Sequence, residues 1–244
     1  MLSGQIQLAP FDVLQTYAPA NAQDYPTNLG QIGVTPDGRI FRLGFNNTVS
    51  TTLAACKLAQ GPAITSGYQG GAVSAQSIGD TQITYTFTGS QTIAANTFAN
   101  GYLSLITGTG SVIQYLIKGH GATSASTTLV LNLFDPIVIA TSGTLTANLW
   151  QNPYSAVIIC PTTVTGTIIG INPVAVPAQN YAWFQTAGIA TALNQGGTTQ
   201  GLGLAPSGSV AGALATVAAT TNEVASADQA GTDAAYSFVR LTLD

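Results

Sequence analysis

Residues 31–43 read QIGVTPDGRIFRL, two short runs of β-forming residues on either side of a Pro-Asp-Gly turn. Proline presets φ at the first turn position, aspartate can hydrogen-bond its own turn, and glycine accepts the positive φ that a bulged hairpin needs. In the outgoing run, Phe41 and Leu43 point to one face of the strand, whereas Ile40 and Arg42 point to the other. The stretch therefore predicts an antiparallel β-hairpin.

The same kind of signal repeats along the chain. Residues 81–88 (TQITYTFT) alternate Ile83, Tyr85 and Phe87 with threonines, which is typical of a strand with one buried face. Gly, Pro and Asn punctuate further short runs, and we expect strands near residues 52–58, 101–107, 112–117, 127–133, 137–141, 145–149, 156–160, 164–171, 181–186, 188–193, 201–206, 211–217 and 236–243. Many short strands at a spacing of about 8–12 residues indicate a barrel or sandwich.

The expected fold is all-β, an antiparallel barrel or sandwich of many short strands with an extended N-terminal arm. The arm is residues 1–30, which are polar, interrupted by proline and without a sustained period. Residues 31–180 would form the main β domain, and residues 181–244 a C-terminal β subdomain that packs on it or completes it. One helical alternative remains at the Ala-rich residues 211–219, although their Gly, Val and Thr content favours a strand.

Charge is the most unusual feature of the composition. Only 6% of the 244 residues are charged while 45% are hydrophobic, and no Asp, Glu, Lys or Arg occurs between Asp135 and Glu223. A free monomer usually keeps itself soluble with charges at roughly a quarter to a third of its surface positions. Interface cores are depleted of charge because desolvating an unpaired charge is costly. We therefore expect a subunit of a larger assembly, the alternative being a lone domain coated with Thr and Ser.

Two classes of partner are not expected. Nucleic-acid binding draws its affinity from cations on phosphates, and here five Lys and Arg residues are scattered in a chain of net charge −4. Mean hydropathy is +0.31, but the most apolar stretch, residues 156–178, is broken by three prolines and two glycines, so a membrane-spanning helix is not expected.

A search for catalytic chemistry gives no candidate, and we expect neither an enzyme nor a cofactor or metal site. The chain has a single histidine, His120, which lies between glycines and is predicted to be an exposed loop residue. Two cysteines, Cys56 and Cys160, favour free buried thiols over a disulfide. A glycosidase needs only two carboxylates and is the hardest enzyme to exclude, but no Asp or Glu pair stands in an aromatic context.

Several segments, taken in order, resemble one family of proteins. They are the hairpin at 35–42 (TPDGRIFR), CKLAQGPA at 56–63, LFDPI at 133–137, NPYSAVI at 152–158, YAWFQTAGIATAL at 181–193, and PS at 206–207 followed by VAGA at 210–213. From residue 31 onward the chain is similar to tailed-phage virion proteins described as head decoration, cement or structural proteins.

This resemblance implies a virion structural role and a β-rich fold, with no catalytic residues to carry over. We expect a capsid decoration protein on the outer surface of the phage head, made in the host cytoplasm, that bridges subunits of the major capsid protein and self-associates as a homotrimer. Two alternatives stay open: a tail component (tube, baseplate or fibre subunit) and a glycan-binding receptor module.

Six residues are predicted to make contacts with neighbouring subunits. Three are aromatic residues of the arm, which is the segment expected to reach onto a neighbour, two are hairpin arginines, and one is an aromatic residue of a later strand: Phe11, Tyr17, Tyr25, Arg39, Arg42 and Trp183.

Overall fold

The computed structural model describes residues 17, 19, 29–63, 65–106, 112–143, 145–217 and 222–244. These form an all-β protein with antiparallel pairing, as the sequence predicts. The chain divides into two compact units. We call Ile64–Asn152 the barrel unit, and Met1–Ala63 together with Pro153–Asp244 the split unit. Most of the predicted N-terminal arm lies outside the described residues.

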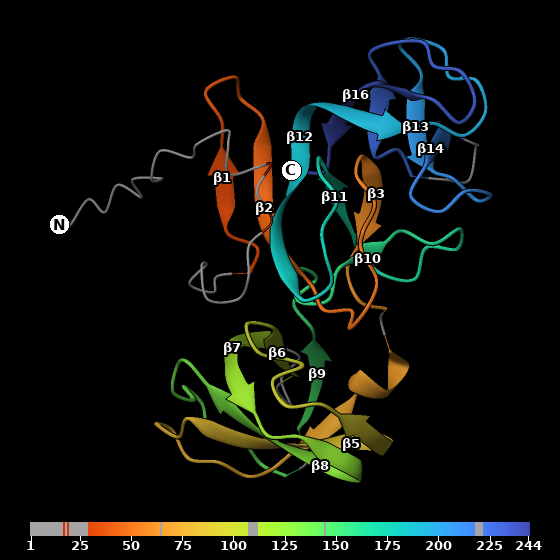
Figure 1. Ribbon diagram of the computed structural model, residues 1–244. Helices are drawn as coiled ribbons and strands as arrows, with labels where there is room; N and C mark the ends of the chain where they lie inside the picture. Colours follow the sequence, from red (N-terminus) through yellow and green to blue (C-terminus); the bar gives the residue numbers. More distant parts are fainter. Residues whose placement is uncertain are drawn as a thin grey trace, which may run out of the picture. The chain divides into compact units, whose positions relative to one another are not determined.

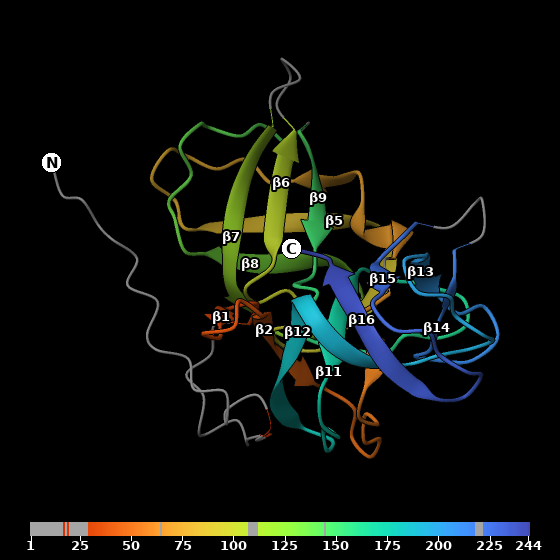
Figure 2. The ribbon, with the colours of Figure 1, turned by 90° about the horizontal axis from the view of Figure 1, so that it is seen from above.

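The barrel unit is a closed six-stranded barrel, preceded by one turn of 3-10 helix at Ser66–Tyr68 (Figure 1). Its strands close in the order β4-β5-β8-β7-β6-β9, and β5 and β8 cross the direction of β6 and β7 steeply (Figure 2). Their bounds are β4 (Gly71–Val73), β5 (Gln82–Ile93), β6 (Tyr102–Ile106), β7 (Val112–His120), β8 (Thr123–Leu133) and β9 (Thr146–Trp150).

Strict alternation of side chains fills the barrel. On β5, Ile83, Tyr85 and Phe87 are buried while the intervening threonines are less so, as the sequence predicts. The other strands contribute their own alternate residues to the same core, and Ala147 is its smallest member. The predicted β6–β7 hairpin is also confirmed, with Leu103 opposite Tyr115. The interior is therefore packed with side chains, as in other small barrels.

The split unit is one ten-stranded sheet that draws on both ends of the sequence. Its main path runs β10-β3-β11-β12-β16-β15-β13-β14, and β2 pairs with both β1 and β12. The strands are β1 (Ile32–Val34), β2 (Ile40–Asn46), β3 (Lys57–Gln60), β10 (Ile158–Ile159), β11 (Ile168–Asn172), β12 (Asn180–Leu193), β13 (Gly203–Pro206), β14 (Leu214–Thr216), β15 (Ala225–Ala227) and β16 (Tyr236–Thr242).

The β1–β2 hairpin confirms the opening prediction. Ile32 lies opposite Arg42, Gly38 has a φ of 83°, and its N–H donates to the carbonyl of Thr35 at 2.9 Å. Phe41 is fully buried, on the predicted inner face.

Strand β12 pairs with three other strands of the sheet, β2, β11 and β16, and it is longer than expected. Two strands were expected, at 181–186 and 188–193, but the structure has one continuous strand. Its register with β2 shifts between Gln185 and Ala187, and Gly188 follows with a φ of 84°. The shift is a β-bulge that bends the strand, so its first half pairs with β2 and its second half with β16.

The boundaries of the two compact units differ from those of the expected domains. The boundary expected at residue 180/181 falls at the start of β12, which pairs with β2 from the N-terminal part of the sequence. The strands before and after that boundary thus belong to one sheet. The barrel unit is instead an insertion between β3 and β10.

The two ends of the insertion meet in the split unit. The N–H of Gly61 donates to the carbonyl of Thr167 at 2.8 Å, and a Cβ at Gly61 would lie 2.5 Å from the carbonyl oxygen of Pro153. Glycine is therefore required at residue 61, because the outgoing and returning backbones touch there.

One local expectation is confirmed and one needs correction. The strand expected at 211–217 is present as β14, which pairs with β13, and the helical alternative is not adopted in the described part of 211–219. Residues 137–141 form no strand; only Thr141 makes an isolated bridge, to Gln76. Ile137 is nevertheless buried, which explains the apolar pattern without strand pairing.

Candidate interaction surface

A groove on the split unit brings together two of the six predicted contact residues. Tyr17 and Arg39 line it, together with side chains from β11, β12 and β16, and its volume is about 350 Å³. The remaining lining residues are Cys56, Ile171, Pro173, Gln185, Ile189, Ala190, Thr191 and Phe238.

Arg39 is held in place by several neighbours. Its Nε donates to Oδ2 of Asp37 at 2.8 Å, and its guanidinium lies over the Phe41 ring, 5.6 Å from the centroid. Burial works against the charge, but hydrogen bonds to Tyr17 and Asp37 outweigh it and raise the pKa of Arg39. Tyr17, half exposed, is thereby tied to the hairpin of its own chain.

Arg42 also finds its partner within the chain. Its Nε and Nη2 donate to the two carboxylate oxygens of Asp244 at 2.7 and 2.9 Å, and its Nη1 donates to the carbonyl of Gly30 at 3.1 Å. These bonds hold the pKa of Asp244 below its usual value, while burial raises the pKa of the adjoining Tyr154 to about 12. The fork–fork pair clamps β2 to the last residue of the sequence.

Trp183 belongs to the core rather than to a contact surface. Its side chain is 4% exposed and packs with Phe41, Leu43 and Tyr181. The expectation of an accessible aromatic is therefore wrong for this residue, because both faces of β12 are buried from Tyr181 to Thr186. Phe11 and Tyr25 lie outside the described residues.

The surface residues that the sequence reasoning missed are on β16. Tyr236 and Phe238 are 56% and 53% exposed and alternate with buried Ser237 and Val239. Cross-strand pairing places Phe238 opposite Thr191 on β12. The alternation in YSFVRLTL was visible in the sequence, but which face is outward depends on pairing with β12 and β15.

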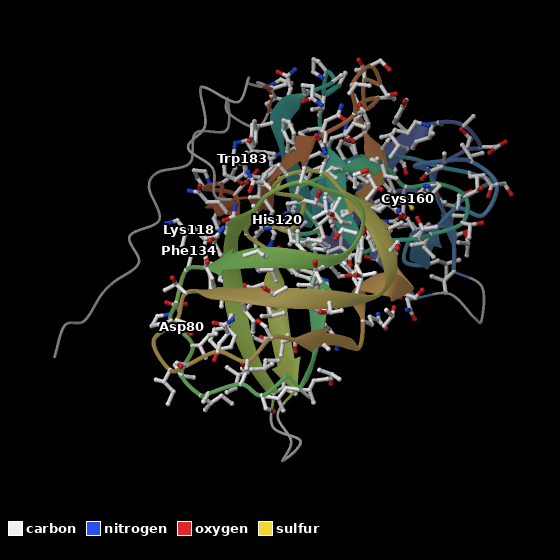
Figure 3. All side chains as sticks on the ribbon, turned by 90° about the horizontal axis from the view of Figure 1, so that it is seen from below. Asp80, Lys118, His120, Phe134, Cys160 and Trp183 are labelled. Atoms are coloured by element: carbon white, nitrogen blue, oxygen red, sulfur yellow. The ribbon has the colours of Figure 1, made fainter. Side chains whose placement is uncertain are left out.

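His120 is a structural residue, which corrects the expectation of an exposed loop position. It ends β7, is 5% exposed, and its Nε2 accepts from the N–H of Phe98 at 3.0 Å. Its Nδ1 lies 2.7 Å from the carbonyl of Gly121. Both nitrogens are engaged, burial lowers the pKa of the ring, and Lys118 lies nearby on the same strand (Figure 3).

The two thiols and several carboxylates are buried or hydrogen-bonded to the backbone of the chain. Both cysteines are free; Cys160 is buried, which raises its pKa to about 11, and Cys56 is only partly buried. Asp80 accepts from the N–H of Ser77 at 2.8 Å, and Asp233 accepts from that of Gly196 at 2.6 Å. Within the described ranges, no group of three or more His, Cys, Asp or Glu could hold a metal ion.

Three ion pairs on the described surface each join an arginine to an aspartate of the same chain. Arg39, Arg42 and Arg240 pair with Asp37, Asp244 and Asp228 at 2.8, 2.7 and 3.0 Å. These arginines are three of the five Lys and Arg residues in the sequence, and Lys57 and Lys118 are the other two. Exposed apolar side chains occur on both units, among them Val130, Phe134, Tyr236 and Phe238.

Comparisons with known proteins add no relative. The chain matches no protein-family model, and the searches of curated proteins and of solved structures gave no match. Of the helices in the described part of the chain, none is long and apolar enough to cross a membrane.

Proposed function

We propose that this protein is a structural subunit of a tailed-phage virion, a decoration protein that binds the outside of the head and stabilises the shell by bridging subunits of the major capsid protein. The observation that carries the proposal is the combination of a nearly charge-free surface with exposed large apolar side chains. A protein with that surface is suited to being covered by neighbours.

The paired arginines support the same conclusion. Because Arg39, Arg42 and Arg240 each face a carboxylate of the same chain, little free positive charge remains for phosphates or for long-range steering of a partner. Association must then draw on apolar burial and hydrogen bonds, which salt screens little.

The groove lined by Tyr17 and Arg39 supports the proposal. Phe238 and Ile189, both exposed, line it as well, and neither side chain carries a hydrogen-bonding group. A neighbouring subunit that covered this face would bury both. A homotrimer is the proposed assembly, because a cyclic trimer matches the threefold positions of a shell.

Immunogold labelling of intact virions tests the location. The proposal expects gold over the head exterior, on particles whose shell is unbroken. Label along the tail or at its tip would favour the alternative of a tail component, and label only on broken heads would place the protein inside; either result contradicts the proposal.

Light scattering of the purified protein tests the assembly. A mass of about three times 24.8 kDa is expected for the trimer. Six-membered rings or filaments would instead indicate a tail-tube subunit.

A further inference from the structure

A second surface feature, on the barrel unit, is a groove across three neighbouring strands. It lies on β6, β7 and β9 and has a volume of about 460 Å³, within the range of small-molecule sites. It is lined by Tyr102, Ser104, Gln114, Asn148 and Trp150. No lining side chain is charged, and the proposed capsid contacts make no use of the groove.

Two aromatic rings form one end of the groove. Tyr102 and Trp150 lie directly opposite each other on β6 and β9, with centroids 5.7 Å apart and ring planes 34° apart. They are 39% and 41% exposed. A Cβ at Gly101 would lie 2.2 Å from the carbonyl oxygen of Trp150, so the two backbones are in contact beside the pair. The two rings are thus neighbours on the barrel face, and both are partly exposed to solvent.

A row of neutral polar groups forms the other end. Ser104 lies opposite Gln114 on one side and opposite Asn148 on the other, so the three side chains cross the barrel face in line. Oδ1 of Asn148 accepts from the N–H of Gly70 at 2.8 Å, which orients the amide. Hydroxyl and amide groups both donate and accept hydrogen bonds.

This combination selects for one kind of ligand. A flat apolar face is needed to cover the rings, where polarised C–H groups meet the negative ring face. Groups that both donate and accept are needed for the polar row, since an apolar protein side chain would leave it without partners. Phosphate or carboxylate groups would find no cation here. A pyranose ring, with C–H faces and hydroxyl edges, meets all of these conditions.

We propose that the groove on β6, β7 and β9 binds a neutral saccharide, which stacks on Tyr102 and Trp150 and hydrogen-bonds to Ser104, Gln114 and Asn148. A single shallow site of this kind is expected to bind weakly, with a Kd on the order of 1 mM. Several copies on one particle would act together on a polysaccharide surface and gain avidity. Saccharide binding is independent of whether the protein decorates a phage head.

Tryptophan fluorescence offers a direct test on the full chain. Trp150 is exposed whereas Trp183 is 4% exposed, so a ligand that covers the groove should change the emission of Trp150. The probes are soluble oligomers of glucose, galactose, mannose and N-acetylglucosamine, each titrated to about 10 mM. At least one of them is expected to give a saturable shift to shorter wavelength.

Variants assign the shift to the groove. Tyr102→Ala and the exposed Gln114→Leu are each expected to raise the Kd at least about tenfold, the latter by removing hydrogen bonds while keeping volume. Phe134→Ala is the matched control, an exposed aromatic of the same unit that does not line the groove, and should leave binding unchanged. Melting curves confirm that each variant is folded.

Three results would overturn the proposal. One is the absence of a saturable shift with all four oligomers. Another is equal binding by Tyr102→Ala and Phe134→Ala. The third is an emission shift that depends on protein concentration without saccharide and is lost in Tyr102→Ala, which would make the groove a contact between copies of this chain.

Discussion

At the residue scale, the few charges of this protein act mainly within the chain. The two hairpin arginines, Arg39 and Arg42, are predicted from the sequence to contact neighbouring subunits. In the structure Asp37 and Asp244 lie beside them. Asp37 is only two positions away, but Asp244 is brought to Arg42 by the pairing of β2 with β12 and of β12 with β16. Side-chain partners at such separations depend on tertiary structure.

The Arg42–Asp244 clamp predicts a pH-dependent contribution to stability. Arg42 holds the pKa of Asp244 below its usual value, so the pair stabilises the fold above the unfolded pKa of about 3.9 and loses that effect as pH falls through the lower folded pKa. Asp244→Asn should lower the free energy of unfolding by about 1 kcal/mol at pH 7. Urea unfolding at pH 7 and at about pH 2 measures it.

The difference between Asp244→Asn and the parent protein should shrink between pH 7 and about pH 2, because Asp244 takes up a proton as pH falls through its folded pKa and the charge of the pair is then lost. An equal difference at both pH values would contradict the electrostatic origin. Asp135→Asn removes an exposed carboxylate and is the control, expected to change stability by less than about 0.5 kcal/mol.

At the element scale, strands were predictable where alternation was strong. The hairpin at 31–43 and the buried face of β5 follow from local pattern alone, because turn residues and period-2 alternation are local properties. The two strands expected at 181–186 and 188–193 are one continuous strand, β12, whose register with β2 shifts at a bulge between Gln185 and Ala187. Short strands such as β15 (Ala225–Ala227) exist only through their neighbours β13 and β16.

Alanine substitutions at two glycines of the barrel, Gly71 on β4 and Gly89 on β5, should differ strongly in their effect on stability. A Cβ at Gly71 would lie 2.3 Å from Cζ of Tyr85 and 2.4 Å from the carbonyl oxygen of Thr86, whereas a Cβ at Gly89 on β5 would meet no atom within 4 Å. Gly71→Ala should destabilise the protein by about 3 kcal/mol, because buried Tyr85 cannot move without opening the core.

Gly89→Ala is the matched control and should change stability by less than about 0.5 kcal/mol. Chemical denaturation of both variants measures the contrast. Equal stability of Gly71→Ala and Gly89→Ala would mean that β4 is not held against Tyr85 as described.

At the scale of the whole molecule, two units with separate cores share one chain. The barrel unit's cluster is drawn from residues 73–149, and the clusters of the split unit are drawn from the remainder. An insertion of this kind cannot be inferred from local pattern, because strands before and after it look alike. The domain division expected from the sequence accordingly has no boundary near residue 64.

Removal of the insertion should leave the split unit folded. Since Gly61 touches Pro153, a short Gly-Ser linker in place of residues 64–152 can join the two backbones without strain. Circular dichroism and thermal unfolding of this deletion protein are expected to show β structure and one cooperative transition. A deletion protein without a transition would mean that the split unit depends on the barrel.

The proposed decoration role is tested most directly by binding of the purified protein to phage heads that lack it, followed by sedimentation. The proposal predicts that binding saturates at a fixed number of copies per head. That number should be the same in about 0.1 M and about 1 M NaCl, because the arginines are paired within the chain and few charges remain whose attraction salt could screen. Failure to bind the heads, or release by moderate salt, would contradict the account of a neutral capsid-bridging surface.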